Sequence, residues 1–189
     1  IIKNDLNISF ENTQLILTLY FTFLAFGQIL SGPFSDKYGR KPILLLGASI
    51  YSVSAFCASL SSNIEILLIL RSFQGFGAAA CLSVGRTILS DCYEIKEAAK
   101  EMSKMTAIMA VIPISCFIFG GFLAEFLGWR TNLLALGLIS LILIVAMLFL
   151  LNETLIKKAK SVSFKNMFIV YRGLLKNFSF NFFTITTAM

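Results

Sequence analysis

The chain has 189 residues, of which 57% are hydrophobic and only 14% are charged, and its mean hydropathy is +0.83. About 25% of the residues of an ordinary soluble domain are charged. The composition of this chain therefore excludes an ordinary soluble domain and indicates a protein of the lipid bilayer. The formal net charge is +6. That charge alone is compatible with nucleic-acid binding, but the long apolar runs and the placement of the basic residues favour a membrane surface instead.

Long uncharged runs divide the chain into regular segments. A helix needs about 20 consecutive apolar residues to cross the hydrocarbon layer. Runs of that kind predict membrane-spanning helices over residues 13–34, 42–60, 64–90, 105–125 and 131–151. A last apolar run over residues 178–189 is too short to span the membrane. The expected fold class is therefore all-α and polytopic, with five complete spans and the start of another. We expect both ends to be truncations, because the chain begins with isoleucine and ends inside an apolar run.

Basic residues gather in alternate loops, which sets the expected orientation. Residues 35–41, 91–104 and 152–177 carry most of the lysines and arginines, and the positive-inside rule places these loops in the cytoplasm and residues 1–12 outside. In the last of these loops apolar residues recur at helical spacing between basic ones. This pattern predicts an amphipathic helix lying on the inner leaflet. A helix that binds a specific protein partner is the alternative.

The hinge between the first two spans, residues 32–42, is rich in glycine and charge. One acid and three bases are more than a turn needs, and Gly39 can supply a positive φ for the reversal. The simplest interpretation is a solvated turn whose basic residues fix the orientation. Asp36 can pair with Arg40. The sharper hypothesis is a conformational latch, in which Asp36 holds the cytoplasmic ends of two halves of a larger protein together in one state and releases them in the other. The residues assigned to it are Gly32, Asp36, Gly39, Arg40, Lys41 and Asp91.

A single arginine, Arg71, lies well inside the third apolar run. A charge there costs at least about 2.5–3.5 kcal/mol on insertion scales, so it is expected to face protein or a wet cavity. Spacing places a set of residues on one helix face with it and makes them cavity candidates: Arg71, Gln74, Gly75, Ala78 and Leu82. Small residues beside them, Gly77 and Ala79, let another helix approach closely. Arg71 either belongs to a buried structural ion pair or tunes a nearby acid that carries a proton.

Two of these segments resemble motifs of the major facilitator superfamily of transporters. The hinge matches the pattern G-x-L-x-D-x-x-G-R-K-x-x-L, with Phe34 in place of the first leucine. The segment around Arg71 matches L-x-x-x-R-x-x-Q-G-x-G-A-A at every specified position. The resemblance implies helices two to seven of a twelve-helix transporter. Residues 1–151 then form part of the N-terminal bundle, residues 152–177 the cytoplasmic linker, and residues 178–189 the start of the C-terminal bundle.

Weaker motifs suggest the subfamily. Antiporters of the superfamily carry G-x-x-x-G-P-x-x-G-G in helix five, and this chain keeps only Gly120 and Gly121, with Phe117 at the proline position. Pro113 instead completes an A-x-x-P sequence and predicts a kink, and Glu153 begins an E-T-L sequence. Both are similar to drug–proton antiporters of the bicyclomycin/chloramphenicol-resistance type. The resemblance implies proton-coupled efflux of small hydrophobic compounds across the bacterial inner membrane. The alternatives are a sugar or metabolite uniporter or symporter, and a partial reading frame that does not transport.

The residue inventory argues against an enzyme and against a metal site. The chain has no histidine, and its four cysteines have no metal-ligand spacing. We expect no cofactor beyond the proton gradient. The expected partners are a small-molecule substrate, protons, the bilayer, a preceding helix one and the C-terminal half of the transporter, with no nucleic acid. The acids Glu65, Asp91 and Glu125 lie near the ends of their spans, so the resemblance implies that the proton-carrying acid belongs to helix one.

Overall fold

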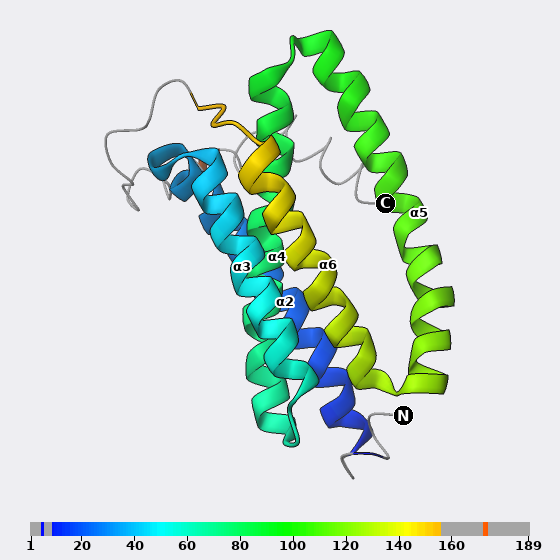
Figure 1. The fold of residues 1–189 in the computed structure, drawn as a ribbon. Helices are drawn as coiled ribbons and strands as arrows, with labels where there is room; N and C mark the ends of the chain where they lie inside the picture. Colours follow the sequence, from blue (N-terminus) through cyan, green and yellow to red (C-terminus); the bar gives the residue numbers. More distant parts are fainter. Residues whose placement is uncertain (1–4, 6–8, 156–171, 174–189) are drawn as a thin grey trace.

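The computed structural model describes residues 5, 9–155 and 172–173, and long helices dominate this part of the chain (Figure 1). They are α2 (Phe10–Tyr38), α3 (Arg40–Ser59), α4 (Ile64–Cys92), α5 (Ile95–Leu127) and α6 (Trp129–Leu150). Each of these five is long and apolar enough to cross a membrane. The expected all-α fold class with five spans is therefore confirmed.

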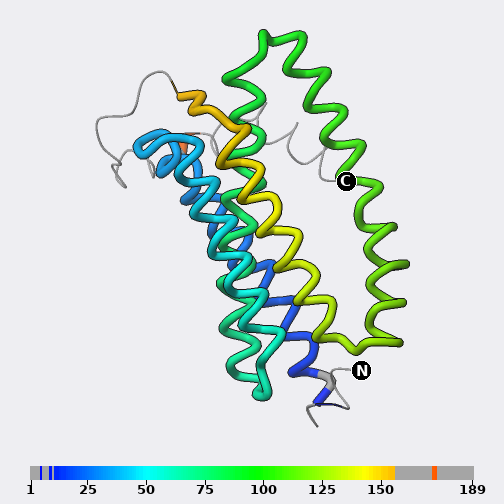
Figure 2. The backbone as a smooth tube through the Cα atoms, viewed as in Figure 1, coloured from blue at the N-terminus to red at the C-terminus, as the bar shows by residue number. Residues whose placement is uncertain are grey.

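The helices alternate in direction, so their ends gather at two levels. We call the level of Gly39, Asp91 and Glu153 the basic end, and the level of Ser61 and Gly128 the opposite end. Helix α4 lies against both α2 and α3, and α6 lies against α3. Helix α5 stands away from these four and joins α6 at the opposite end, as Figures 1 and 2 show. No residue in the most apolar stretch of α5 is buried among the described residues.

The reversals between helices are short because single residues supply the required backbone. Gly39 has φ 112° between α2 and α3, and Gly128 has φ 85° between α5 and α6. Both values lie in a region that a residue with a Cβ rarely adopts. At the turn between α3 and α4, the Asn63 side chain accepts a hydrogen bond from the backbone N–H of Glu65 at 3.0 Å and caps α4.

Two helices extend further than the apolar runs that predict them. Helix α2 continues to Tyr38, through residues expected to form the hinge, so the chain reverses at Gly39 alone. Helix α5 begins at Ile95, ten residues before the expected span 105–125. Its first turns are rich in alanine, lysine and glutamate, which favour helix in water, and Lys104 pairs with Glu101 at 2.6 Å. Hydropathy marks only the part of a helix that lipid surrounds.

Small and hydroxylated residues hold α3 and α6 together. The Ser52 hydroxyl donates to the carbonyl of Gly137 at 3.0 Å, and the Ser140 hydroxyl donates to the carbonyl of Ala48 at 3.1 Å. Both serines are buried. Because lipid offers helices no hydrophobic reason to associate, such interhelical hydrogen bonds and close backbone approach hold membrane bundles together.

The amphipathic helix expected in residues 152–177 lies largely outside the described residues. Asn152 to Leu155 are described and are not helical. The start of a further span at residues 178–189 also lies outside them.

Candidate functional site: a charge cluster and a buried arginine

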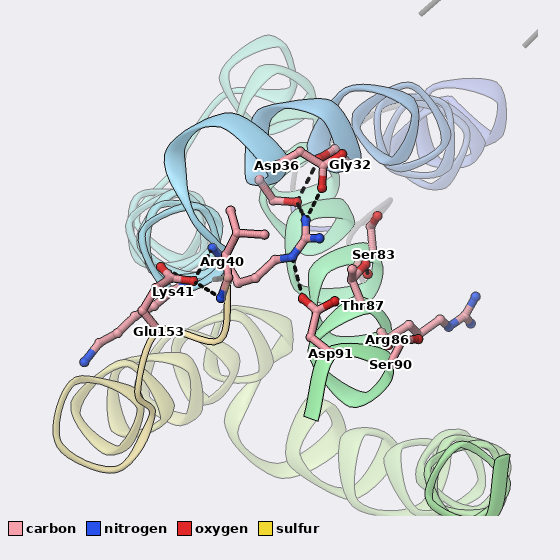
Figure 3. A network of polar contacts seen from close by, with 12 residues as sticks. Gly32, Asp36, Arg40, Lys41, Ser83, Arg86, Thr87, Ser90, Asp91 and Glu153 are labelled. Atoms are coloured by element: carbon pink, nitrogen blue, oxygen red, sulfur yellow. Dashed lines mark hydrogen bonds and ion pairs between the residues drawn. The ribbon is translucent and has the colours of Figure 1, made fainter. Parts of the chain in front are cut away.

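A buried arginine is the centre of a polar cluster at the basic end (Figure 3). Arg40, 6% exposed, is the first residue of α3. Its Nη1 donates to Asp36 Oδ1 at 2.5 Å and to Ser35 Oγ at 2.6 Å, and its Nε donates to Asp91 Oδ2 at 2.9 Å. One guanidinium therefore joins the end of α2 to the end of α4 with charge-assisted hydrogen bonds.

The two carboxylates of this cluster differ in exposure. The side chain of Asp36 is 53% exposed, whereas that of Asp91 is 26% exposed. Ser35 is fully buried, and its hydroxyl donates to the Gly32 carbonyl at 2.8 Å while it accepts from Arg40. The structure thus brings together four of the expected switch residues: Gly32, Asp36, Arg40 and Asp91. Of the two carboxylates, Asp36 has more surface available to another group.

Glu153, just after α6, caps the start of α3. Its carboxylate accepts from the backbone N–H of Arg40 at 2.9 Å and from that of Lys41 at 3.3 Å. The first N–H groups of a helix lack partners within the helix and carry partial positive charge, so a carboxylate there is favourable. Partial burial acts to raise the pKa of Glu153, but hydrogen bonds from the backbone of Leu155, Arg40, Lys41 and Thr154 outweigh it, and the pKa lies below its usual value.

Lys41 does not join the cluster of carboxylates. Its ammonium donates to the Leu148 carbonyl at 2.9 Å, near the last turn of α6. A cation at a helix C-terminus complements the partial negative charge of the unpaired carbonyls. Glu153 and Lys41 together fasten the end of α6 to the start of α3.

A second polar site lies inside the bundle on α4. Arg71 Nη1 donates to Gln74 Oε1 at 3.0 Å, one turn along the helix. Gln74 is fully buried. Two nitrogen atoms of this pair, Arg71 Nε and Gln74 Nε2, are buried without a hydrogen-bond acceptor in the part of the chain that the structure describes. A buried donor left unpaired costs about 1–3 kcal/mol, so the site calls for an acceptor.

The groups around Arg71 are neutral. The phenols of Tyr20 on α2 and Tyr51 on α3 both interact electrostatically with the guanidinium. Among the described residues, Arg71 forms no ion pair with a carboxylate. The buried structural ion pair that the sequence left open is not formed by these residues.

Glycines let α2 and α3 approach the helix that carries Arg71. A Cβ at Gly75 would collide with the backbone of Tyr20, and a Cβ at Gly77 would lie 2.7 Å from the backbone nitrogen of Tyr51. The same contacts place the two tyrosines on either side of α4. Ala79 is fully buried and Ala78 is half-buried. The small-residue pattern thus sets where the phenols stand relative to Arg71.

The small residues and the proline of α5 lack such close packing in the described part of the chain. Pro113 is exposed, the helix runs through it, and a Cβ at Gly121 would meet nothing within 4 Å. At Gly120 the neighbour is Asn132 of α6, whose Nδ2 donates to the Gly120 carbonyl at 2.9 Å. Helix packing through these three residues remains a prediction about a surface that the described helices do not cover.

A third cluster, at the opposite end, has no counterpart in the motifs of the sequence. Asp5 accepts hydrogen bonds from Trp129 Nε1 at 3.0 Å and from Arg130 Nη1, and Arg130 Nη2 donates to the Ser61 carbonyl at 3.1 Å. The hydrogen bonds from Arg130 and Trp129 hold the pKa of Asp5 below its usual value. This cluster ties the segment before α2 to the turns at the ends of α3 and α5.

Sequence reasoning missed several contributors to these sites. Glu153 is recognised only by resemblance, and nothing local in the sequence shows that it caps a helix 113 residues away. Tyr20, Tyr51 and Asp5 carry no motif. The signal for the tyrosines is their polar hydroxyl within an apolar run. The described cysteines are all free, and no group of three or more described histidine, cysteine or acidic residues could hold a metal ion.

Bundled spans with a charge cluster at one end, and with a partly buried arginine that forms no ion pair among the described residues, are typical of an integral membrane protein with a functional site inside the bilayer. The whole chain, residues 1–189, matches the family model of the Major Facilitator Superfamily, and the chain belongs to that family. That superfamily comprises membrane transporters and not enzymes.

Curated relatives agree with this assignment. The chain is 32% identical over 153 residues to a bicyclomycin resistance protein homolog of Haemophilus influenzae, covering 81% of this chain and 38% of the relative. It is 35% identical over 136 residues to a chloramphenicol resistance protein of Pseudomonas aeruginosa, covering 71% and 32%. It is 34% identical over 190 residues to an uncharacterized transporter of the same family, YdgK of Bacillus subtilis, covering 99% and 47%. The chain thus spans less than half the length of these relatives.

Proposed function

We propose that this chain is part of the N-terminal half of a proton-coupled transporter that exports small, partly hydrophobic compounds across the bacterial inner membrane. The observation that carries the proposal is the part-buried Arg71–Gln74 pair within a membrane span, in which two buried donor atoms are unpaired among the described residues. A buried charge in a span is expensive and marks a functional pathway by default. Two relatives that are named for resistance to bicyclomycin and chloramphenicol support drug-like substrates.

The role of Arg71 follows from its chemistry. A guanidinium does not release its proton in a protein, so Arg71 cannot itself carry the transported proton. It can favour the charged form of an acid nearby. In this proposal an acid outside this chain faces Arg71, and protonation of that acid frees the donors of Arg71 and Gln74 for a carbonyl or similar acceptor on the substrate. Proton and substrate then occupy the site alternately, which is what antiport needs.

The cluster around Arg40 serves as the gate at the basic end, which the positive-inside rule makes cytoplasmic. Asp36 keeps surface available beyond its bond to Arg40. Contact between Asp36 and the second half of the transporter would hold the cytoplasmic side closed, and its loss would open it. The gate can shift this balance only if Asp36 has partners in one state that it lacks in the other.

Proton flux that depends on a drug is the experiment that tests this function. The complete transporter is placed in inverted membrane vesicles, and the internal pH is followed after chloramphenicol is added. We expect the drug to release protons from the vesicles as it enters. Arg71→Gln should abolish this flux, whereas Arg86→Gln, which changes an exposed arginine of the same helix, should keep it. Substrate movement without proton flux, or in the same direction as the proton, would favour the uniporter or symporter alternative.

The gate has its own test in Asp36→Asn. This variant keeps the shape of the side chain and removes its charge, and we expect slower drug export at unchanged amounts in the membrane. Glu97→Gln, in the exposed first turn of α5, is the matched control. Unchanged transport and unchanged expression of Asp36→Asn would refute the gate.

A further inference from the structure

A groove opens on the side of the bundle between α2 and α3 near the basic end. Its cavity volume is about 470 Å³, and its lining is almost wholly apolar. Residues of three helices form it, among them Gly27, Ser31 and Phe34 of α2, Pro42 and Leu46 of α3, and Phe76 of α4. We call it the lateral groove. It is separate from the Arg71 site and from the Arg40 cluster, because none of their charged residues lines it.

The length of the lateral groove matches one leaflet of a bilayer. Along α2 it extends from Tyr38 at the end of the helix to Gly27. Eleven helical steps at 1.5 Å give roughly 16 Å. Half the hydrocarbon layer is about 15 Å thick. The groove therefore begins at the basic end of α2 and stops near the middle of that helix, a length comparable to the depth of one leaflet.

The surface end of the groove carries an aromatic pair and a cation. The rings of Phe34 and Tyr38, which both line the groove, stack with centroids 6.1 Å apart. The Lys37 ammonium lies 4.8 Å from the centre of the Tyr38 ring. Lys37 pairs with no carboxylate among the described residues, since its neighbour Asp36 is bonded to Arg40. A tyrosine with a lysine beside it is typical of the level of lipid head groups.

A single extended hydrocarbon chain suits this space, because the groove is small, about 470 Å³, and its lining is almost wholly apolar. Such a chain can follow the roughly 16 Å of the groove. The positive charge of Lys37 at the surface end of the groove favours a lipid with a negatively charged head group.

We propose that the lateral groove binds one acyl chain of an anionic phospholipid, with the phosphate of its head group on Lys37. The chain lies along α2 and α3 over the floor that Phe76 provides. Because the groove is walled by both helices that meet at Gly39, a bound lipid packs directly against the helix ends that carry the Arg40 cluster.

Native mass spectrometry of the complete transporter tests this proposal. The purified protein is stripped of lipid and offered phosphatidylglycerol or phosphatidylcholine with identical acyl chains, and the bound lipids are counted. We expect the wild type to retain one phosphatidylglycerol with clear preference over phosphatidylcholine. Lys37→Gln should weaken phosphatidylglycerol binding about fivefold, as for the loss of one basic residue at an anionic surface, and should leave phosphatidylcholine unchanged. Leu46→Trp, which fills the groove, should lower the retention of both lipids.

Matched variants keep the outcome interpretable. Leu17→Trp changes an equally accessible leucine outside the groove, and Lys96→Gln removes an exposed lysine elsewhere. Both should retain lipid as the wild type does. Unchanged phosphatidylglycerol binding in Leu46→Trp would overturn the proposal. Leu46→Trp with normal lipid retention but a separated or unstable second half would show that the groove seats protein, and would overturn it equally.

Discussion

Replacement of Arg40 by methionine should lower the free energy of unfolding by about 3–4 kcal/mol through the loss of contacts at the basic end. Methionine keeps much of the buried volume but removes every donor. The bond to Asp36 is half exposed and contributes about 0.5 kcal/mol. The bond to the less exposed Asp91 contributes about 2 kcal/mol, and the buried Ser35 hydroxyl loses a charged donor at a cost of about 1 kcal/mol.

The same exposures predict an order among the carboxylates. Asp91→Asn should cost about 2 kcal/mol, because its side chain is only 26% exposed, and Asp36→Asn less than about 1 kcal/mol. Arg40→Lys keeps the charge but cannot reach both helices at once, so we expect an intermediate loss. Asp36 would then matter for the rate of transport more than for stability.

Unfolding in mixed micelles with increasing dodecyl sulfate measures these differences in the free energy of unfolding. The wild type, the two arginine variants and the two aspartate variants are compared under one set of conditions. Arg40→Met within about 0.5 kcal/mol of the wild type would show that water replaces the guanidinium at no cost. Equal losses for Asp36→Asn and Asp91→Asn would contradict the reasoning from exposure.

Three further predictions concern other parts of the bundle. The pKa of Glu153 is lowered in the folded protein, so the stability that its cap contributes is fully present above the ordinary pKa of about 4.3. This stability is lost only as the pH falls through the lowered pKa. Glu153→Gln should therefore lower the free energy of unfolding equally at pH 6 and pH 8. Gly77→Ala should cost stability, because its Cβ would meet the α3 backbone, whereas Gly85→Ala, where nothing lies within 4 Å, should be neutral or stabilising in the same micelle assay. Trp129 is the only tryptophan, and its fluorescence should stay constant from pH 8 to pH 5 and change only as the lowered pKa of Asp5 is crossed; a transition near pH 6 would refute the contact.

Local signals in the sequence account for the spans and for much of the hinge. The apolar runs locate all five described helices, and the spacing of charge around Gly39 indicates which residues can meet there. The extra turns of α2 and α5 were missed because hydropathy detects lipid contact, while helix propensity continues into water. The contacts of Glu153 with α3 and of Asp5 with Arg130 join residues more than a hundred positions apart. No periodicity encodes such a pairing.

The Arg71 site shows a different limit. The sequence predicts a costly charge in a span and the small residues that bring neighbours close. It does not tell which side chains those neighbours present, because that depends on how α2 and α3 are rotated against α4. Tyr20 and Tyr51 therefore emerge only from the packing at Gly75 and Gly77. The roles of all these residues in transport remain predictions.

The ties at both ends of the bundle have a mechanical consequence. Arg40 and Glu153 fasten α2, α3, α4 and α6 at one end, and Arg130 links the turns at the other. A bundle whose helices are linked at both ends rotates as a rigid body, and its helices do not slide past one another. Helix α4 has 29 residues and is about 43 Å long. A tilt of about 10° around its middle moves each end by roughly 4 Å, in opposite directions. Such a tilt would widen the gap to a facing helix bundle on one side of the membrane and narrow that gap on the other side.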